Sequence, residues 1–540
     1  MKRRRFIKSV GALGVTTLAP SIFTNEHFIK KVNAAGLVNN ANLVVPARLP
    51  QVINIFLYGG PSELAGNLTN IADINANSQN PYDAARNAGG AGSGILLFDD
   101  DPGADPALEA TGQITPHGFW RDAGGTAMED MLTGNGFGTA GADDSAEAML
   151  SVYRTINRRK ENTRAHRPSI LSSQKGNLDI ELSGGMGTTI ASVLFANKSQ
   201  LDGSAVLGNR NLEDLVLPFV SFEGESSAFA PDVSASGVNL PLTMRGISLD
   251  TSFDNPYSRG RSVVGGADQS ALDNLVAKRT ANSNSRFQEV SDGFSNRSSL
   301  ENKISGFTTN IDNDSLLPVI STADPDCDNT TGRLVYPNGS FSSRVKAAVT
   351  LAIQNPDSLY ITVGGGLGGW DDHDNAIEKY ENRMTDLMTT LRVAAKHLKH
   401  GQRFDLTDPD NPVANPSIDT DNIIINVHGD FGRNVNLNGS MGWDHGNNQN
   451  LYTIGGSAIR GQGALGKVVG KTERFGDSGQ NRQFTRPTDD SYEAEPMSIA
   501  ATVYSYFGVQ NPEVLTADAE FNPSGDPKID ETVAGEAVLF

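Results

Sequence analysis

The fold is decided by a run of eight residues near the start of the chain, Gln51-Val52-Ile53-Asn54-Ile55-Phe56-Leu57-Tyr58, which the turn-forming residues Gly59-Gly60-Pro61 end. A short, mostly apolar run that stops at glycine and proline is typical of a buried strand. Four later runs have the same character, at residues 216–222, 359–363, 422–427 and 450–454. Pro218, inside the first of these four, predicts an irregular start to that strand.

Two helical patterns alternate with these strands. Apolar residues recur at steps of three and four from Ile377 to Leu398, with charged residues between them, which predicts a helix with one apolar stripe. Residues 343–354 show the same pattern. The order helix, strand, helix, strand is typical of a mainly parallel sheet. We therefore predict an α/β protein, a three-layer α/β/α sandwich with long loop insertions.

The composition is that of a globular protein. The chain has 540 residues, 38% of them hydrophobic, and no repeat of 20 to 50 residues. We expect one domain over residues 35–540, with an inserted loop or lid at residues 67–144, which are rich in Gly, Ala, Asn and Asp. Asp99-Asp100-Asp101 in this insertion lacks a recognisable calcium-ligand spacing, which favours a solvated loop over a calcium site.

The first 34 residues predict export. Arg3-Arg4-Arg5-Phe6-Ile7-Lys8 is followed by a modest apolar run at residues 9–23, a pattern that resembles a twin-arginine signal peptide. Val32-Asn33-Ala34 offers a cleavage site, which would make the mature protein periplasmic or secreted, with no stable membrane span. An uncleaved leader that anchors the protein is the alternative, although its apolar run is short for a span.

Charge and cysteine content narrow the partners further. The formal net charge of −19 disfavours nucleic acid and anionic lipid and favours divalent cations, calcium among them. The chain has one cysteine, so no intrachain disulfide can form. Stability has to come from the core, with bound metal as a further source.

Polar clusters follow the predicted strands where ligands collect in an open α/β sheet, beyond the carboxyl ends of the strands. Ser62 and Glu63 come after the first strand, and His428-Gly429-Asp430-Phe431-Gly432-Arg433 ends the strand at 422–427. Two similar stretches, Gly369-Trp370-Asp371-Asp372-His373 and Gly442-Trp443-Asp444-His445-Gly446, follow one strand and precede another. These two are therefore not a repeat, and we predict that they form two sides of one crevice.

Histidine and carboxylate are the usual ligands of zinc, manganese or iron. Three of the eight histidines, His373, His428 and His445, lie in these clusters. Two such metals would suit hydrolysis or transfer at phosphorus or sulfur. The alternative is that Asp371 and Asp444 cap turns while their histidines bond to backbone.

Taken in order, several blocks resemble the DUF1501 family, exported bacterial proteins of mostly unknown function that are grouped with the alkaline phosphatase and sulfatase superfamily. The blocks span roughly residues 50 to 510 and are Ile55-Phe56-Leu57-Tyr58-Gly59-Gly60-Pro61-Ser62, Gly368-Gly369-Trp370-Asp371-Asp372-His373, Gly429-Asp430-Phe431-Gly432-Arg433, Asp444-His445-Gly446 and Gly455-Gly456-Ser457-Ala458-Ile459-Arg460-Gly461. The resemblance implies an alkaline phosphatase-like fold and a divalent metal such as zinc or manganese.

Carried over by position, the resemblance implies that Asp371 and His373 bind one metal and that Asp430 binds another. His445 would return to the first metal. Asp444 would either orient His445 or be a ligand itself.

The departures from that pattern concern the chemistry. The superfamily has a metal-binding carboxylate after the first strand, where only Glu63 is available here. His166 stands where a nucleophile is expected, and it could attack phosphorus, bind metal or donate a hydrogen bond. Ser62 is either a nucleophile or substrate contact or a helix N-cap, and Arg433 either clamps an oxyanion or forms a surface ion pair.

These features leave two functions open. One is metal-dependent hydrolysis or transfer on a phosphate or sulfate ester, of a small molecule or a polymer. The other is a non-catalytic exported binding or assembly protein on a degenerate form of the same fold.

Overall fold

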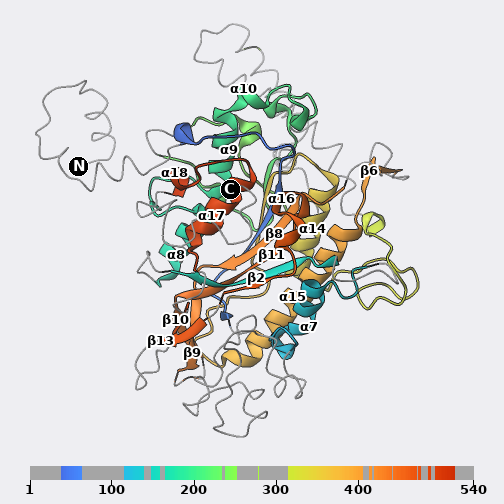
Figure 1. Cartoon of the computed structure of the whole chain (residues 1–540), viewed down its shortest axis with the longest axis vertical. Helices are drawn as coiled ribbons and strands as arrows, with labels where there is room; N and C mark the ends of the chain where they lie inside the picture. The colour runs from blue at the N-terminus through green and yellow to red at the C-terminus, as the bar shows by residue number, and fades with distance from the viewer. Residues whose placement is uncertain are drawn as a thin grey trace, which may run out of the picture.

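The computed structural model describes residues 38–63, 115–138, 147–158, 164–233, 238–251, 278, 314–405, 413–415, 419–438, 440, 442–470, 472–475, 484–487 and 493–516 (Figure 1). The predicted leader and Asp99-Asp100-Asp101 lie outside these residues. No helix among the described residues combines the length and the apolar character needed to cross a membrane.

An eight-stranded sheet runs through the molecule in the order β12-β2-β11-β8-β1-β5-β3-β4. Strand β1 lies near its middle and pairs in parallel with β5 on one side and β8 on the other. Only β11 runs against the other seven strands of this sheet, since it pairs antiparallel with both β8 and β2. The strands are β1 Gln51–Leu57, β2 Leu150–Asn157, β3 Phe219–Ser221, β4 Ile247–Ser248, β5 Tyr360–Gly364, β8 Ile423–Gly429, β11 Asn448–Gly455 and β12 Val468–Val469.

The prediction of a mainly parallel α/β protein is confirmed. All five predicted strands are present, and the run at 216–222 is shortened to β3 because Leu217, just before Pro218, has a positive φ of 51°. Strands β2, β4 and β12 extend the sheet beyond the predicted ones.

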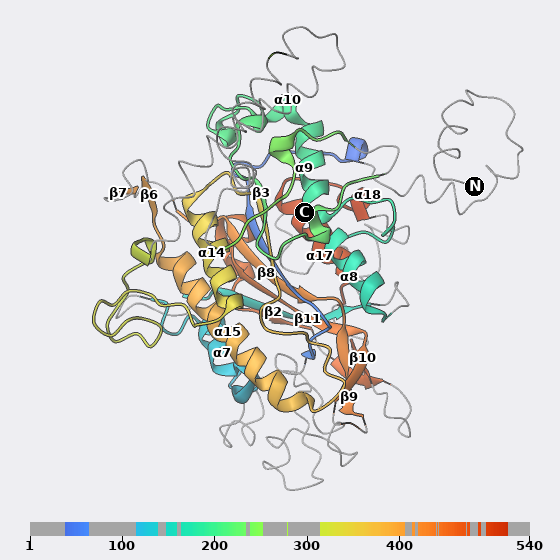
Figure 2. The same cartoon turned by 180° about the vertical axis from the view of Figure 1, so that it is seen from behind.

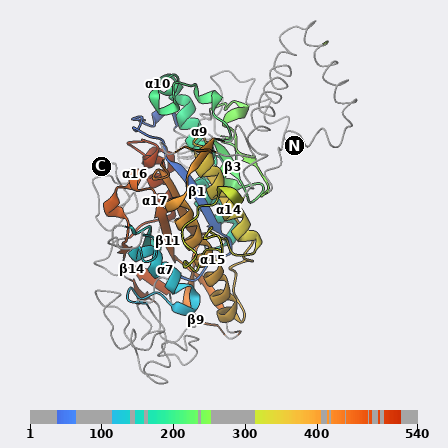
Figure 3. The same ribbon diagram turned by 90° about the vertical axis from the view of Figure 1, so that its right-hand side faces the viewer.

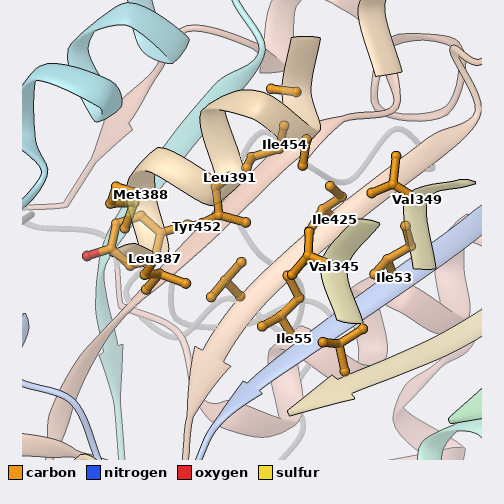
Figure 4. Packing of buried hydrophobic residues seen from close by; sticks show 14 of the residues in the cluster. Ile53, Ile55, Val345, Val349, Leu387, Met388, Leu391, Ile425, Tyr452 and Ile454 are labelled. Carbon is orange, nitrogen blue, oxygen red and sulfur yellow. The ribbon is translucent and has the colours of Figure 1, made fainter. Parts of the chain in front are cut away.

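One face of the sheet is covered by α7 Gly125–Thr133, α14 Ser340–Gln354 and α15 Ala376–His400. Helices α14 and α15 lie side by side (Figure 2). Alternate residues of a strand point to opposite faces, so Ile53 and Ile55 of β1 pack toward Val345 and Val349 of α14 (Figure 4). The apolar stripe predicted for α15 meets the same core through side chains such as Leu391.

The other face carries α8 His166–Lys175, α9 Met186–Ala196 and α17 Pro496–Tyr506. Val52 of β1 belongs to this second core with Met186, Ile190 and Val503. In Figure 3, β1 lies between α17 and α14, so helices cover both faces of the sheet.

The remaining elements are short. Three two-stranded sheets pair β6 Arg403–Asp405 with β7 Val413–Asn415, β9 Gly432–Leu437 with β10 Trp443–Gly446, and β13 Thr472–Phe475 with β14 Phe484–Pro487. The short helices are α10 Lys198–Leu201, α16 Ser457–Arg460 and α18 Glu513–Thr516.

The insertion predicted at residues 67–144 is not all loop. Residues 64–114 and 139–146 lie outside the described part of the chain, but residues 115–138 are described and include α7. Met128 and Met131 of this helix are fully buried in the core that faces α15. This part of the predicted lid is a piece of the core, because the apolar face of α7 packs on the helix layer.

The carboxyl ends of β1, β5 and β8 meet at one edge of the sheet. Antiparallel β11 begins at that edge, and the β9–β10 hairpin that precedes it lies at the lower end of the molecule in Figure 1. His428 was expected in the loop after β8 but lies inside the strand, fully buried, with Nε2 3.0 Å from Asn54 Oδ1. Burial lowers the pKa of His428 to about 4, and this side chain belongs to the core.

Candidate metal centre

Four side chains meet beyond this edge: His166, Asp371, His373 and His445. One ligand atom from each lies within 4.8 Å of all the others. His166 is the first residue of α8, the next two lie in the loop between β5 and α15, and His445 lies in β10. The cluster could hold a metal ion.

The two Trp-Asp-His stretches meet backbone to backbone. The amide of Trp443 donates to the carbonyl of Asp372 at 2.7 Å, and the amide of Trp370 donates to the carbonyl of Tyr58 after β1 at 2.9 Å. A Cβ at Gly442 would lie 1.9 Å from the backbone carbon of His373, so only glycine fits there. The two stretches form two sides of one site, as the sequence predicted.

Helix α15 anchors both stretches through Tyr380. The rings of Trp370 and Trp443 are buried and lie 6.1 and 5.4 Å from the Tyr380 ring, edge to face. The Tyr380 hydroxyl donates to the carbonyl of Ser62 at 2.6 Å. The loops after β1 and β5 and strand β10 are thus packed around one aromatic side chain.

The spacing of the ligand atoms suits one ion. His373 Nε2 and His445 Nε2 are 3.0 Å apart, and Asp371 Oδ1 lies 2.9 and 3.4 Å from them. His166 Nε2 is 3.2 Å from the same oxygen. Four ligands placed tetrahedrally at zinc bond lengths of about 2.0–2.1 Å would be about 3.3 Å apart. The observed separations match the edges of such a tetrahedron.

The outer nitrogen of each histidine faces an oxygen acceptor. His445 Nδ1 lies 2.6 Å from the carbonyl of Arg164, and His373 Nδ1 lies 3.4 Å from Asp444 Oδ1. His166 Nδ1 lies 2.8 Å from Asp430 Oδ2. Carbonyl and carboxylate oxygens accept hydrogen bonds, so the proton of each neutral imidazole resides on Nδ1.

The three Nε2 atoms therefore direct lone pairs toward Asp371. His166 Nε2 is buried and has no hydrogen-bond partner in the described part of the chain. Burial and then the charge of Arg433 lower the pKa of His445, which disfavours a second proton on that ring. Lone pairs and a carboxylate that converge in this way fit a bound cation.

Asp371 is ionised at neutral pH. Burial raises the pKa of its carboxyl, but the hydrogen bond from Arg433, the charge of Arg433 and the charges of His166 and His373 outweigh burial and lower it to about 2. The donor set is three imidazole nitrogens and one carboxylate oxygen.

The centre is open to solvent. The side chains of His373 and Asp371 are 44% and 46% exposed, and those of His166 and His445 are 30% and 24% exposed. An ion held by these four residues would be reachable by water or by a small anion.

Asp430, which the resemblance placed on a second metal, lies behind His166 and is not one of the four. Its carboxylate is fully buried, and Oδ1 accepts from the amide of Gly59 at 3.1 Å. Asp444 orients His373 and not His445 as considered from the sequence.

Arg433 joins the loops that carry the site. Its side chain is buried, which excludes the surface ion pair considered from the sequence. The Nε atom donates to Gly60 O at 2.7 Å, Nη1 to Trp443 O at 3.0 Å, and Nη2 to Trp370 O at 3.0 Å and Asp371 Oδ1 at 2.8 Å. The third carbonyl bound by Nη2 is that of Gly59. All three nitrogens are engaged inside the protein.

Ser62 and Glu63 are also buried and lie outside the group of four. Glu63 Oε2 lies 3.4 Å from the amide of Arg433, so this carboxylate supports the turn into β9. The helix that Ser62 was considered to cap would begin at residues outside the described part of the chain.

The sequence placed His166 near the site but left its role open among nucleophile, ligand and hydrogen-bond donor. The structure brings it into the metal-binding group because α8 follows β2, whose carboxyl end lies at the same edge. Recognition of β2 as a strand would have been the signal for this placement.

Comparison of the chain with protein-family models, with curated proteins and with solved structures found no match in any of the three.

Proposed function

We propose that this protein is a metal-dependent hydrolase or transferase that acts on phosphate or sulfate esters. The observation that carries the proposal is the convergence of three Nε2 lone pairs and the ionised Asp371 at a solvent-reachable sheet edge. Ligands of open α/β proteins bind at this edge.

The donor set favours a transition-metal ion. Imidazole suits zinc, manganese and iron, whereas calcium takes six to eight oxygen ligands. We therefore propose one zinc or manganese ion held by His166, Asp371, His373 and His445. The bound ion would supply Lewis-acid polarisation of an ester oxygen or of water.

The residues around the centre support an anionic substrate. The guanidinium of Arg433 lies 2.8 Å from Asp371 Oδ1 and offsets the charge of that carboxylate. Arg164 lies beside His445, whose carbonyl it approaches through Nη1 at 3.3 Å. The positive charge of an ion would then remain available to an approaching phosphate or sulfate group.

The resemblance of the sequence blocks to the DUF1501 family and the alkaline phosphatase-like superfamily supports the same chemistry. Export by the twin-arginine route is part of the proposal and rests on the N-terminal sequence. Replacement of Arg3 and Arg4 by Lys, followed by fractionation of the expressing cells, tests this part: retention of the variant in the cytoplasm is expected, and unchanged export would contradict it.

One observation favours the non-catalytic alternative. Four protein ligands already complete a tetrahedron, as in structural zinc sites, and the side chains of Ser62 and Arg433 are buried. An exported metal-binding or assembly protein is therefore the second candidate.

Turnover by reconstituted protein separates the two candidates. We expect wild-type protein loaded with zinc or manganese to hydrolyse at least one of p-nitrophenyl phosphate, bis-p-nitrophenyl phosphate and p-nitrophenyl sulfate. His445→Ala should lower kcat/KM at least about 100-fold, because a ligand is lost. One bound ion without turnover of any of these esters would favour the non-catalytic candidate.

A further inference from the structure

Asp430 lies behind the cluster, at the point where β8 ends. We propose that Asp430 is a positioning residue that sets the metal affinity of the centre by fixing the tautomer and the orientation of His166, without touching the ion. The inference rests on the metal centre of the proposed function and adds a role to a residue outside the group of four.

The carboxylate of Asp430 is held from both sides. Its Oδ2 accepts from His166 Nδ1 at 2.8 Å, and its Oδ1 accepts from the amide of Gly59 at 3.1 Å. The backbone carbonyl of the same residue accepts from Nε of the buried Arg158. With both oxygens engaged and the side chain fully buried, Asp430 has little freedom to turn toward the centre.

The ring of His166 is fixed as a consequence. Phe431 and His445 flank it, with ring centroids 4.8 and 4.6 Å away. A carboxylate on Nδ1 keeps the proton on that nitrogen and leaves the Nε2 lone pair toward Asp371. His166 is therefore ready to bind before an ion arrives.

Asp430 is better placed for this role than the matching carboxylate on His373. Asp444 is 38% exposed and lies 3.4 Å from His373 Nδ1, whereas Asp430 is buried and 0.6 Å closer to its histidine. Charge-assisted hydrogen bonds are stronger when they are short and shielded from water. The two aspartates thus form a natural pair of test and control.

Asp430→Asn changes the tautomer with little change of volume. The amide can still accept from Gly59 and would donate its NH₂ to His166 Nδ1, which moves the imidazole proton to Nε2. Loss of such an outer partner weakens metal binding by about 10- to 100-fold. For Asp444→Asn we expect no more than about a fivefold change, because exposed pairs contribute little.

The test measures affinity and tautomer separately. Zinc affinity is determined by competition with a chromophoric chelator for wild type, Asp430→Asn and Asp444→Asn, with thermal unfolding of each metal-free protein as the check on folding. ¹⁵N–¹H correlation spectra of metal-free, ¹⁵N-histidine-labelled protein report the tautomer of His166, and the low histidine count of eight keeps the assignment tractable. Absorption of the cobalt-loaded proteins reports the ligand set.

We expect Nδ1–H in wild type, Nε2–H in Asp430→Asn, and a cobalt spectrum of unchanged form in both. Equal zinc affinity in wild type and Asp430→Asn, or Nε2–H in metal-free wild type, would overturn the inference. A changed cobalt spectrum would instead make Asp430 a ligand. If the variant does not fold, the wild-type tautomer alone decides. A wild type that binds no zinc would sink the proposed function, a result distinct from all of these.

Discussion

At the scale of single residues, Arg433 has the largest structural task near the site. Its guanidinium bonds to four backbone carbonyls, those of Gly59, Gly60, Trp370 and Trp443, which belong to three different segments. A planar fork with five N–H donors can satisfy such a set, whereas a lysine ammonium has a single nitrogen.

We predict that Arg433→Lys lowers the free energy of unfolding by about 3 kcal/mol or more, because buried carbonyls and Asp371 lose their partner. Urea unfolding of metal-free protein measures this loss. Arg167→Lys is the matched control, since Arg167 is exposed and next to His166; its effect should stay within about 0.5 kcal/mol. Equal stability of Arg433→Lys and wild type would contradict the role assigned to Arg433.

Residue types and spacing were enough to find Asp371, His373 and His445, because polar residues after buried strands converge at one edge. The roles of His166 and Asp430 could not be settled in this way. Which of them faces the centre depends on a hydrogen bond between residues 264 positions apart. His428 misled for the opposite reason, because β8 runs two residues further than its apolar run.

At the scale of elements, the close approach of the two Trp-Asp-His stretches depends on a missing side chain. Gly442 lies against the backbone of His373, whereas nothing lies within 4 Å of a Cβ placed on Gly369. The two glycines occupy corresponding positions before their tryptophans but meet different surroundings.

We predict that Gly442→Ala separates the stretch before β11 from the loop after β5 and weakens metal binding at least about tenfold, because ligand positions are sensitive to small shifts. The Gly369→Ala protein should bind zinc as wild type does. Chelator competition measures both affinities, and thermal unfolding shows whether each variant folds. Similar affinities for the two variants would show that the close approach does not control the site.

Strands with continuous apolar runs and the long helix α15 could be predicted, because periodicity and apolar runs depend on sequence alone. Strand β2 was missed because it carries buried polar residues. Ser151 Oγ donates to the carbonyl of Ala464 at 2.5 Å, and Arg154 Nη2 donates to the carbonyl of His117 at 3.3 Å. Such partners are visible only in the fold, so the polar residues hid the strand.

At the scale of the whole molecule, buried histidines make stability depend on pH. His397 of α15 is fully buried with Nδ1 3.1 Å from the hydroxyl of Tyr336. Burial, and then the charge of Lys346, lowers its pKa to about 3. The unfolded chain, with a pKa near 6.5, binds more protons than the folded chain between these values, so stability falls as pH falls below about 6.5.

We predict that this one group removes about 2 kcal/mol of stability between pH 7 and pH 5. The loss should be absent from His397→Gln, which cannot take up the proton. Urea unfolding of both metal-free proteins at the two pH values gives the comparison as a difference of differences. Parallel pH dependence of wild type and variant would contradict the buried, neutral state of His397.

The overall architecture followed from the alternation of strands and helices, whereas the antiparallel direction of β11 did not. That direction is set by the short β9–β10 hairpin, which returns the chain to the carboxyl edge before β11 begins. The same return places His445 opposite Arg433 in the hairpin register and next to His373. Long-range pairing of this kind completes the site.

The central claim is that His166, Asp371, His373 and His445 hold one divalent ion. Elemental analysis of purified protein, supplied with zinc or manganese and freed of unbound ion, measures the number of ions per chain. Wild type should hold one ion and His373→Ala should hold less than a tenth of that. His117→Ala should match wild type, because His117 is half-exposed and pairs with Glu129 outside the cluster. A wild type without bound ion, or with an ion content that His373→Ala leaves unchanged, would contradict the account.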